Sequence, residues 1–342
     1  MTTPDAPEYP LTLPEMPLHD PYVLADEATG QYFLYTSNVA AMSGEDVVGT
    51  MVYRSRDLRR WSRPSVVFRA AEPMAARQGA WAPEVHVHRG RYILLVTLHD
   101  EEATLPVPAA DGYGLPVPVR NHVRGTFAAV AESPSGPFLP LAEGSLTPPD
   151  FMALDGTLFV DPEGDPWLVY AHEWLQKIDG TIEAIPLRED LAAAAGEPIH
   201  LFRGSEAAWL TADLPRPSAH QLAPYVTDGP QLLRAPSGAL IMLWSTYAKD
   251  RATATGMVEG DYVQTWAVAE SGELAGPWVQ QEPLLRQDSG HGMVFRALDG
   301  DRRPLLIVHR PFRDARGKLY DLEIEGSGLR IGRQLTELDG GG

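Results

Sequence analysis

The stretch Leu154–Ala171 reads "LDGTLFVDPEGDPWLVYA", and its pattern decides the fold. It opens with an acidic residue, Asp155, and continues as an apolar run, a turn that contains Gly164, and a second apolar run. Two strand-like runs joined by a short turn with glycine are typical of a β-hairpin. We therefore predict a hairpin that carries a carboxylate at the start of its first strand.

The same design occurs at four other places in the chain. Self-similarity at a fixed period indicates a repeat architecture, and it disfavours the alternative of a β-sandwich whose strands resemble one another by accident. The four further turn glycines are Gly30, Gly90, Gly238 and Gly300. The four segments are "HDPYVLADEATGQYFLYTS" from His19, "APEVHVHRGRYILLVT" from Ala82, "TDGPQLLRAPSGALIMLWS" from Thr227 and "GHGMVFRALDGDRRPLLIVH" from Gly290.

Each hairpin begins with one polar residue, which we call its anchor. Successive anchors lie 63 to 73 residues apart, a period that fits a four-stranded unit with its loops. Five such units predict an all-β fold, a five-bladed β-propeller with four-stranded blades. We expect one domain over residues 1–342, with no appended β-sandwich domain. The anchors are Asp20, Glu84, Asp155, Asp228 and His291, and the predicted blades cover approximately residues 15–70, 80–142, 150–203, 224–286 and 288–335.

Composition excludes several classes of function. The chain has no cysteine, so disulfides, thiolate metal sites and cysteine nucleophiles are excluded. A formal net charge of -18 argues against a nucleic-acid partner, because no basic stripe is available to neutralise phosphates. No apolar stretch approaches the roughly 18 residues of a membrane span, and the first residues lack the pattern of a signal peptide. We therefore expect no membrane partner and a cytoplasmic protein.

The anchors predict a functional site at one end of the propeller. The innermost strand of each blade lines the central channel, so anchors at the starts of these strands should form a ring of four carboxylates and one imidazole. Clustered carboxylates raise one another's pKa values unless a cation or hydrogen-bond donors compensate. Two long, proline-rich segments, residues 100–123 and 203–226, are expected to line the site as loops.

Paired carboxylates indicate a specific chemistry. Glycoside hydrolysis requires one protonated carboxyl group that protonates the leaving oxygen and one ionised carboxylate that activates water or attacks. A third carboxylate can hold the pKa of the acid high and orient it. Aromatic side chains near the ring would stack on sugar faces, and Trp81 is placed for that role, directly before Ala82-Pro83-Glu84.

Five motifs at the starts of the inner strands together resemble those of glycoside hydrolase family 43. The resemblance covers about residues 15 to 330, with all five motifs in order. It implies a five-bladed propeller and an inverting mechanism in which Asp20 is the general base, Asp155 tunes and orients the acid, and Asp228 is the general acid. The motifs are "HDPYV" from His19, "WAPEV" from Trp81, "LDGTLFVD" from Leu154, "TDGP" from Thr227 and "GHGMVF" from Gly290.

One motif departs from the family pattern. Many members have Glu-Gly-Pro where this chain has Asp228-Gly229-Pro230. Aspartate is one methylene shorter, which reduces its reach by roughly 1.5 Å, and its ordinary pKa is about 3.9 instead of about 4.3. If Asp228 is the acid, the inner strand must lie closer to the axis or the substrate must bind deeper.

The remaining candidates concern binding. We expect His19, Trp81, Glu84 and His291 to contact the substrate, with Glu84 in the pocket wall or the ring and not as a catalyst. The resemblance places His291 in the central channel, where several members hold a calcium ion or a water cluster, while packing or hydrogen bonding explains it equally well. No cofactor is required for the predicted reaction. The spacing of His86 and His88 suits a metal pair, but without a third ligand it does not predict a zinc site.

The expected function is exo-acting glycoside hydrolysis of an arabinose- or xylose-containing oligosaccharide. The resemblance favours an α-L-arabinofuranosidase. The alternatives are a β-xylosidase, or an arabinanase, galactosidase or galactofuranosidase of the same family. Two alternatives from other classes are a carbohydrate-binding propeller without turnover, in which Asp228 marks a lost acid, and a protein-interaction scaffold. A scaffold would not need an acidic residue in almost every inner strand.

Overall fold

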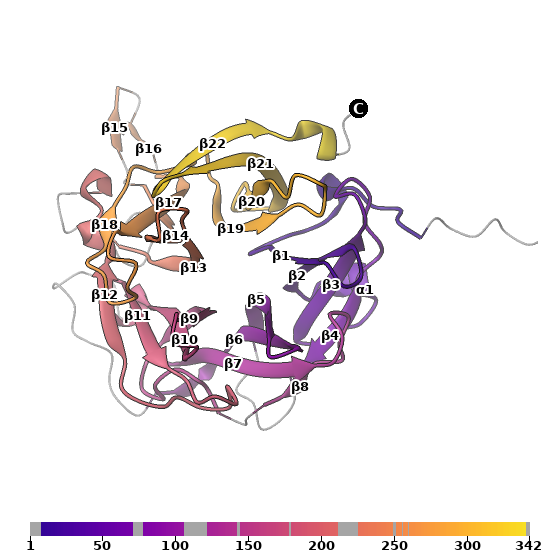
Figure 1. Cartoon of the computed structure of the whole chain (residues 1–342), viewed down its shortest axis with the longest axis horizontal. Coiled ribbons are helices and arrows are strands. Elements are labelled where there is room, and N and C mark those ends of the chain that lie inside the picture. The colour runs from indigo at the N-terminus through magenta and orange to yellow at the C-terminus, as the bar shows by residue number, and fades with distance from the viewer. Residues whose placement is uncertain are drawn as a thin grey trace, which may run out of the picture.

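The protein folds as five four-stranded antiparallel sheets arranged as blades around a central axis (Figure 1). This confirms the predicted five-bladed β-propeller, and the described residues contain no further domain. The fold comes from a computed structural model, which describes residues 8–70, 78–105, 122–141, 144–177, 179–210, 225–248, 251–254, 256–258 and 260–339. Most of the two predicted site loops, residues 106–121 and 211–224, lies outside the described residues.

Within each blade the strands follow the order of the chain from the axis to the rim. Blade 1 contains β1 (Tyr22–Asp26), β2 (Gln31–Ser37), β3 (Gly49–Ser55) and β4 (Ser65–Arg69). Blade 2 contains β5 (Gly79–His88), β6 (Arg91–Thr104), β7 (His122–Ala131) and β8 (Leu139–Pro140). Blade 3 contains β9 (Ala153–Val160), β10 (Pro166–His172), β11 (Thr181–Pro186) and β12 (Ile199–Arg203).

Blade 4 carries an insertion, and blade 5 comes entirely from the C-terminal part of the chain. Blade 4 contains β13 (Asp228–Arg234), β14 (Leu240–Tyr247), β17 (Tyr262–Ala269) and β18 (Val279–Gln280), with the hairpin β15 (Arg251–Thr253) and β16 (Gly256–Val258) inserted. Blade 5 contains β19 (Gly290–Arg296), β20 (Pro304–Arg310), β21 (Arg316–Glu325) and β22 (Gly328–Gln334). The short helices are η1 (Leu13–Glu15), α1 (Ala40–Ser43), α2 (Trp174–Lys177), η2 (Gly204–Glu206), η3 (Ala208–Leu210) and η4 (Thr336–Leu338).

The second strand of each blade has a continuous apolar run because neighbouring blades cover both of its faces. In β14 every residue from Leu240 to Thr246 is buried. Strands covered on both faces lose the alternation of apolar and polar residues that marks a half-exposed strand. Burial of these side chains between blades is the main stabilising contribution to the ring.

The N-terminal segment closes the ring, and among the described residues the first and the last blade exchange no strand. Leu13, Met16 and Leu18 are almost completely buried. The Leu18 amide donates a hydrogen bond to the carbonyl of Ala315 in front of β21, at 3.0 Å. The segment thereby fills the space between blades 5 and 1.

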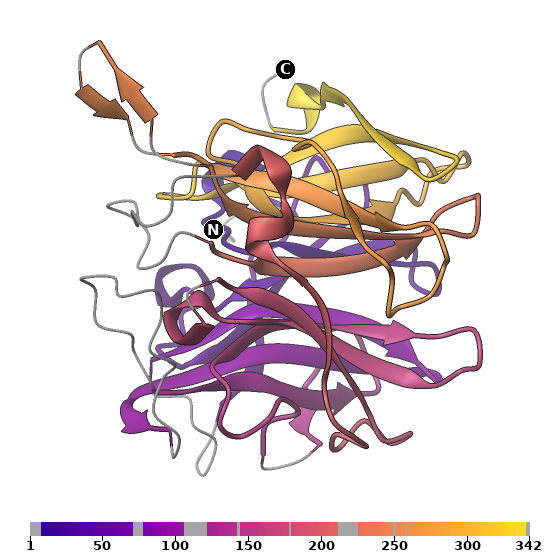
Figure 2. The same cartoon turned by 90° about the vertical axis from the view of Figure 1, so that its left-hand side faces the viewer.

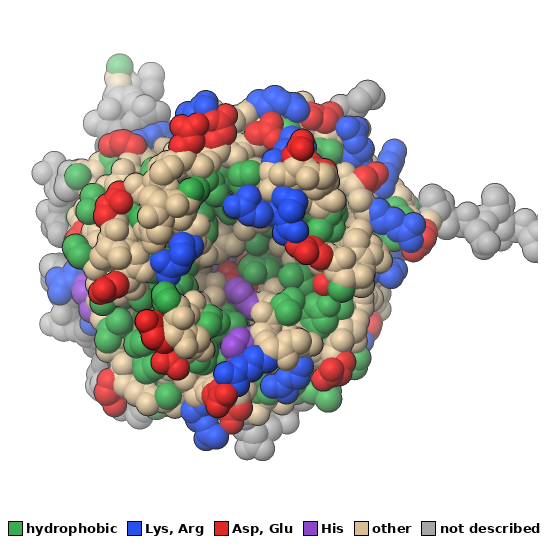
Figure 3. All heavy atoms as spheres, in the orientation of Figure 1, with side chains coloured by type: hydrophobic (Ala, Val, Ile, Leu, Met, Phe, Trp, Pro, Cys, Tyr) green, Lys and Arg blue, Asp and Glu red, His purple; other side chains and the backbone are tan. Residues whose placement is uncertain are grey.

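The two ends of the propeller differ. The turns between the first and second strands of the blades lie at one end, and the β15–β16 hairpin projects beyond the blades at the other (Figure 2). The space-filling view shows a hollow at the centre of the ring, with histidine side chains in it and charged residues around its rim (Figure 3). Within the described part of the chain, no helix has the length and apolarity that a membrane crossing requires.

Candidate active site

A β-bulge in each of the inner strands β5, β9, β13 and β19 positions the central side chains. In these strands two residues oppose a single residue of the neighbouring strand, and the register shifts there. The first residue of each bulge has a positive φ, and so has Asp20 in front of β1. A bulge redirects a side chain and is common next to functional sites. The five equivalent residues are Asp20 (φ 47°), Ala82 (43°), Asp155 (56°), Gly229 (51°) and His291 (46°).

The bulges explain why the predicted ring of anchors differs from the observed one. Asp20, Asp155 and His291 occupy the bulge position, whereas Asp228 lies one residue before it and Glu84 two residues after it. Two residues of a strand correspond to a shift of about 6.6 Å. Glu84 is therefore not among the described residues that line the central cavity, and its carboxylate lies 2.8 Å from Nε2 of His86.

Three carboxylates and one imidazole meet at the axis. Nδ1 of His291 lies 3.1 Å from Oδ1 of Asp20, 3.7 Å from Oδ1 of Asp228 and 3.9 Å from Oδ2 of Asp155. The His291 amide donates to Oγ of Ser245 at 2.8 Å, which holds the bulge in place. The structure therefore brings together the three aspartates that the sequence singled out, and they come from blades 1, 3 and 4.

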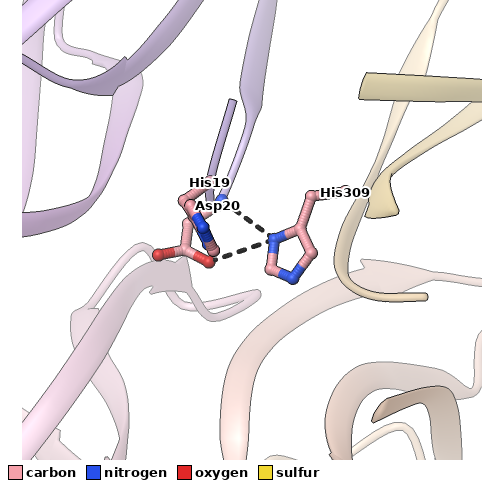
Figure 4. Close-up of side chains that lie close together, drawn as sticks. All are labelled: His19, Asp20 and His309. Atoms are coloured by element: carbon pink, nitrogen blue, oxygen red, sulfur yellow. Dashed lines mark hydrogen bonds and ion pairs between the residues drawn. The ribbon is translucent and has the colours of Figure 1, made fainter. Parts of the chain in front are cut away.

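Asp20 is held in its ionised form. Burial alone would raise its pKa, but the neighbouring imidazole of His291 lowers it, and the pKa lies well below its ordinary value. Nδ1 of His309 accepts a hydrogen bond from the Asp20 amide at 3.1 Å and lies 3.4 Å from Oδ1 of Asp20 (Figure 4). His19 packs edge-on against His309, with 5.0 Å between the ring centroids.

The pKa of Asp155 is shifted in the opposite direction. Burial raises its pKa well above the ordinary value, and the neighbouring Asp228 raises it further. The Gly229 amide donates to Oδ2 of Asp155 at 3.1 Å, and the Asp155 amide donates to Oγ1 of Thr97 at 2.8 Å. Because two adjacent carboxylates resist ionising together, the Asp155–Asp228 pair retains a proton that Asp20 does not.

The carboxylates lie in a cavity of about 560 Å³. Its wall is largely apolar, with a few polar groups pointing inward, which is typical of sites for small molecules. The aromatic residues Trp81, Trp174 and Phe312 line it, together with His19. The cavity thus offers aromatic surfaces next to a proton donor and a proton acceptor.

Trp81 lies in the cavity wall, as the sequence predicted, but other side chains already contact its ring. The guanidinium carbon of Arg124 lies 4.7 Å from the ring centre, and the ring of His99 is 3.7 Å away between centroids. Glu173, which no sequence pattern marks, also lines the cavity and forms a buried ion pair with Arg124. Burial raises the pKa of Glu173, and Arg124 counteracts part of that shift.

The Arg124–Glu173 pair gives a prediction about stability. Replacing Glu173 with glutamine leaves the Arg124 charge buried without its counter-ion, so the free energy of unfolding should fall by about 3–5 kcal/mol. Urea unfolding followed by tryptophan fluorescence measures this change. The matched control is Glu189→Gln, which breaks the exposed Arg89–Glu189 pair and should cost below about 1 kcal/mol. Equal stability of the two variants would contradict the prediction.

A second group of side chains, next to Trp81 and Arg124, resembles a metal site but does not fit one. Ligand atoms of His99, Glu101 and His122 lie within 4.8 Å of one another. However, Nη2 of Arg124 lies 2.9 Å from Nε2 of His122, so this nitrogen accepts from the guanidinium and the ring proton lies on Nδ1. A guanidinium at this distance also repels a cation. We therefore assign no metal to this group.

Two further histidines, His86 and His172, are structural. Nε2 of His86 pairs with Glu84. His172 is buried and lies 3.1 Å from Oε1 of Glu183 and 2.7 Å from Oε1 of Gln176. Their ring nitrogens therefore serve polar contacts of the propeller itself.

Comparisons with known proteins agree with this geometry. The family model described as "Glycosyl hydrolases family 43" matches residues 14–322. An endo-arabinase from Bacteroides thetaiotaomicron VPI-5482 has a similar structure, with a TM-score of 0.75 and 33% identity over 93% of this chain and 98% of that chain. No curated protein sequence matches the chain significantly.

Two more distant structures share the fold. An endo-1,4-beta-xylanase from the same Bacteroides strain has a TM-score of 0.68 and 20% identity, over 93% of this chain and 96% of that chain. An alpha-L-arabinofuranosidase from Lactobacillus brevis has a TM-score of 0.63 and 18% identity, over 92% of both chains. At these identities the likeness concerns the propeller alone.

Proposed function

Because the chain belongs to glycosyl hydrolase family 43 and is thus a glycoside hydrolase, we propose that it removes terminal α-L-arabinofuranosyl residues from oligosaccharides by an inverting mechanism. The observation that carries the proposal is the contrast between the carboxylates around His291. Asp20 is held ionised, whereas the Asp155–Asp228 pair retains a proton. One face of the cavity therefore supplies a base and the other an acid.

In the proposed reaction, ionised Asp20 takes a proton from a water molecule as that water attacks the anomeric carbon. Asp228 gives its proton to the glycosidic oxygen, and Asp155 keeps that proton available by raising the pKa of the pair. The bond between the anomeric carbon and the leaving oxygen breaks as the bond to water forms. The configuration at that carbon is inverted.

The positions of the carboxylates limit the separation between the proposed base and the proposed acid. Oδ1 of Asp20 and Oδ1 of Asp228 lie 3.1 Å and 3.7 Å from Nδ1 of His291, so these two oxygens are at most about 7 Å apart. An inverting step needs roughly 6.5–9.5 Å between the two carboxyl groups to leave room for a water molecule, so the proposed mechanism requires a separation close to this upper bound. The short aspartate at position 228 suits a compact site in which the glycosidic oxygen binds deep.

A resident calcium ion does not fit the cluster around Nδ1 of His291. The oxygen ligands available there are the three aspartates of the proposed mechanism. A divalent cation bound by them would keep all three ionised, and Asp228 could then no longer carry the proton it has to donate. We therefore propose a reaction that needs no cofactor.

A second candidate function is endo-acting cleavage of arabinan. It is favoured by the 33% identity with a protein described as an endo-arabinase. The two candidates share the acid–base chemistry and differ in how the sugar chain extends from the cavity. Reducing-end-labelled α-1,5-arabino-oligosaccharides separate them, because exo action releases only arabinose and endo action releases a mixture of shorter oligosaccharides.

The proposed activity is tested with nitrophenyl α-L-arabinofuranoside, β-D-xyloside and galactosides, with and without a chelator. We expect the arabinofuranoside to be hydrolysed fastest, at a rate that the chelator does not change. NMR at early times should show the inverted anomer first, before mutarotation. Retention of configuration would contradict the mechanism, and sugar binding without turnover on any substrate would make the protein a carbohydrate-binding propeller.

A further inference from the structure

Two stacked aromatic rings connect the acid to the base. Tyr262, at the start of β17 in blade 4, and His309, in β20 of blade 5, lie 5.4 Å apart between centroids and are almost parallel, at 11°. Both side chains are completely buried. Phe312, which lines the cavity, packs edge-on against both rings, at 5.2 Å and 5.6 Å.

Tyr262 holds the carboxylate of Asp228. Its hydroxyl donates a short hydrogen bond to Oδ2 of Asp228, which leaves Oδ1 on the side of His291. The ring has room only because residue 290 is glycine, since a Cβ there would lie 2.2 Å from Cε1 of Tyr262. A hydrogen bond donated to a carboxylate stabilises its ionised form, which is the form that Asp228 reaches when it has given up its proton.

His309 holds the backbone of Asp20. The Asp20 amide donates to Nδ1 of His309, and this bond supports a residue whose positive φ is unfavourable outside glycine. In blades 3 and 5 the amides of Asp155 and His291 instead donate to the hydroxyls of Thr97 and Ser245.

The other blades show what holding the backbone amide requires and what the imidazole of His309 adds to it. Thr97 and Ser245 show that a small hydroxyl is sufficient to hold the amide at the bulge position. At the base, blade 5 has an imidazole instead, and this ring extends far enough to stack on Tyr262. The hydrogen bond from the Asp20 amide therefore does not by itself account for a histidine at position 309.

We propose that Tyr262 and His309 are positioning residues that set the placement of Asp228 relative to Asp20, with the stacked rings as the spacer between them. This inference rests on the proposed function, because it assigns Asp228 and Asp20 as acid and base. Neither residue touches the reacting atoms in this proposal. Tyr262 acts through Asp228, and His309 acts through Asp20.

Tyr262→Phe tests the connection to the acid. The variant keeps the stack and loses the hydroxyl, so kcat on an oligosaccharide, which has a poor leaving group, should fall about 10- to 100-fold. On a nitrophenyl glycoside, whose leaving group barely needs an acid, we expect less than about a threefold change. The control is Tyr247→Phe, which removes a hydroxyl from a neighbouring ring whose centroid lies 4.9 Å from that of Tyr262.

His309→Thr tests the connection to the base. Threonine restores the kind of acceptor that Thr97 of blade 2 provides for the Asp155 amide and removes the ring, so thermal stability should stay close to that of the parent. Because the base acts on every substrate, we expect kcat to fall by about 10²-fold on both the oligosaccharide and the nitrophenyl glycoside. In the double variant kcat should fall by less than the product of the two single reductions, because both substitutions change the same distance between Asp228 and Asp20.

The possible results distinguish a failure of the proposed function from a failure of the positioning role. If the parent protein hydrolyses no glycoside, the proposed function fails. If the parent is active but Tyr262→Phe behaves like Tyr247→Phe on both substrates and at all pH values, the positioning role of the stacked rings is wrong, while the proposed glycosidase activity is retained. An active, well-folded His309→Thr protein with parental kcat would also overturn the spacer.

Discussion

Replacing Asp20 with alanine is expected to lower kcat on every glycoside by about 10²–10⁴-fold. The imidazole of His291 lowers the pKa of Asp20, whereas the pKa of Asp155 is shifted upward. Because the base is needed whatever the leaving group, the loss should be similar for nitrophenyl glycosides and oligosaccharides. Initial rates at saturating substrate measure it.

Added azide tests whether the activity lost in Asp20→Ala is that of a general base. Azide attacks without giving up a proton, and the shortened side chain leaves space for it, so the rate on nitrophenyl glycosides should partly recover. The product should be a glycosyl azide of inverted configuration. Glu189→Gln, an exposed substitution far from the cavity lining, is the control and should keep the parental rate. Parental activity of Asp20→Ala would exclude this residue as the base.

Replacing Asp228 with alanine should separate substrates by their leaving groups. On oligosaccharides kcat should fall by about 10²–10⁴-fold, and on activated nitrophenyl glycosides by much less, because a good leaving group departs without protonation. A plot of log kcat against the pKa of the leaving group should therefore become steeper than for the parent protein. An unchanged slope would show that Asp228 is not the proton donor.

The pH profiles of these variants follow from the directions of the pKa shifts. Asp20 must be ionised, and its lowered pKa keeps it so to below the ordinary range of aspartate, so the acid limb should lie at low pH. The Asp155–Asp228 pair must hold a proton, and the raised pKa of Asp155 preserves that state toward higher pH. The parent should thus be active over a broad range. Asp228→Ala should lose the alkaline limb on nitrophenyl substrates.

The sequence predicted the blades well because each blade is built from neighbouring segments of the chain. Hairpins such as "LDGTLFVDPEGDPWLVYA" carry their apolar runs and turns within twenty residues, and β9 and β10 pair as this pattern requires. Asp20, Asp155 and His291 were found for the same reason, since they repeat at equivalent positions in their blades.

The prediction was less accurate where a single residue of register decides the outcome. The bulge in β5 places Ala82 at the position that Asp155 occupies in β9, so Glu84 lies two residues further along the strand, where it pairs with His86. Spacings of 63 to 73 residues cannot resolve a shift of one or two positions, because loop lengths vary between the repeats. Asp228 reaches the cluster although it lies one residue before the bulge position.

By itself, therefore, the sequence determined the number of blades, the hairpin in each, and the presence of acidic residues at the mouths of the inner strands. These are properties of local periodicity. Only the tertiary structure decided which side chains meet and in which protonation state. Tyr262, His309, Arg124 and Glu173 belong to second or third strands, or directly follow one, and no repeat marks them. The bond between Asp20 and His309 joins residues 289 positions apart, and burial, which shifts the pKa values, exists only once the ring has closed.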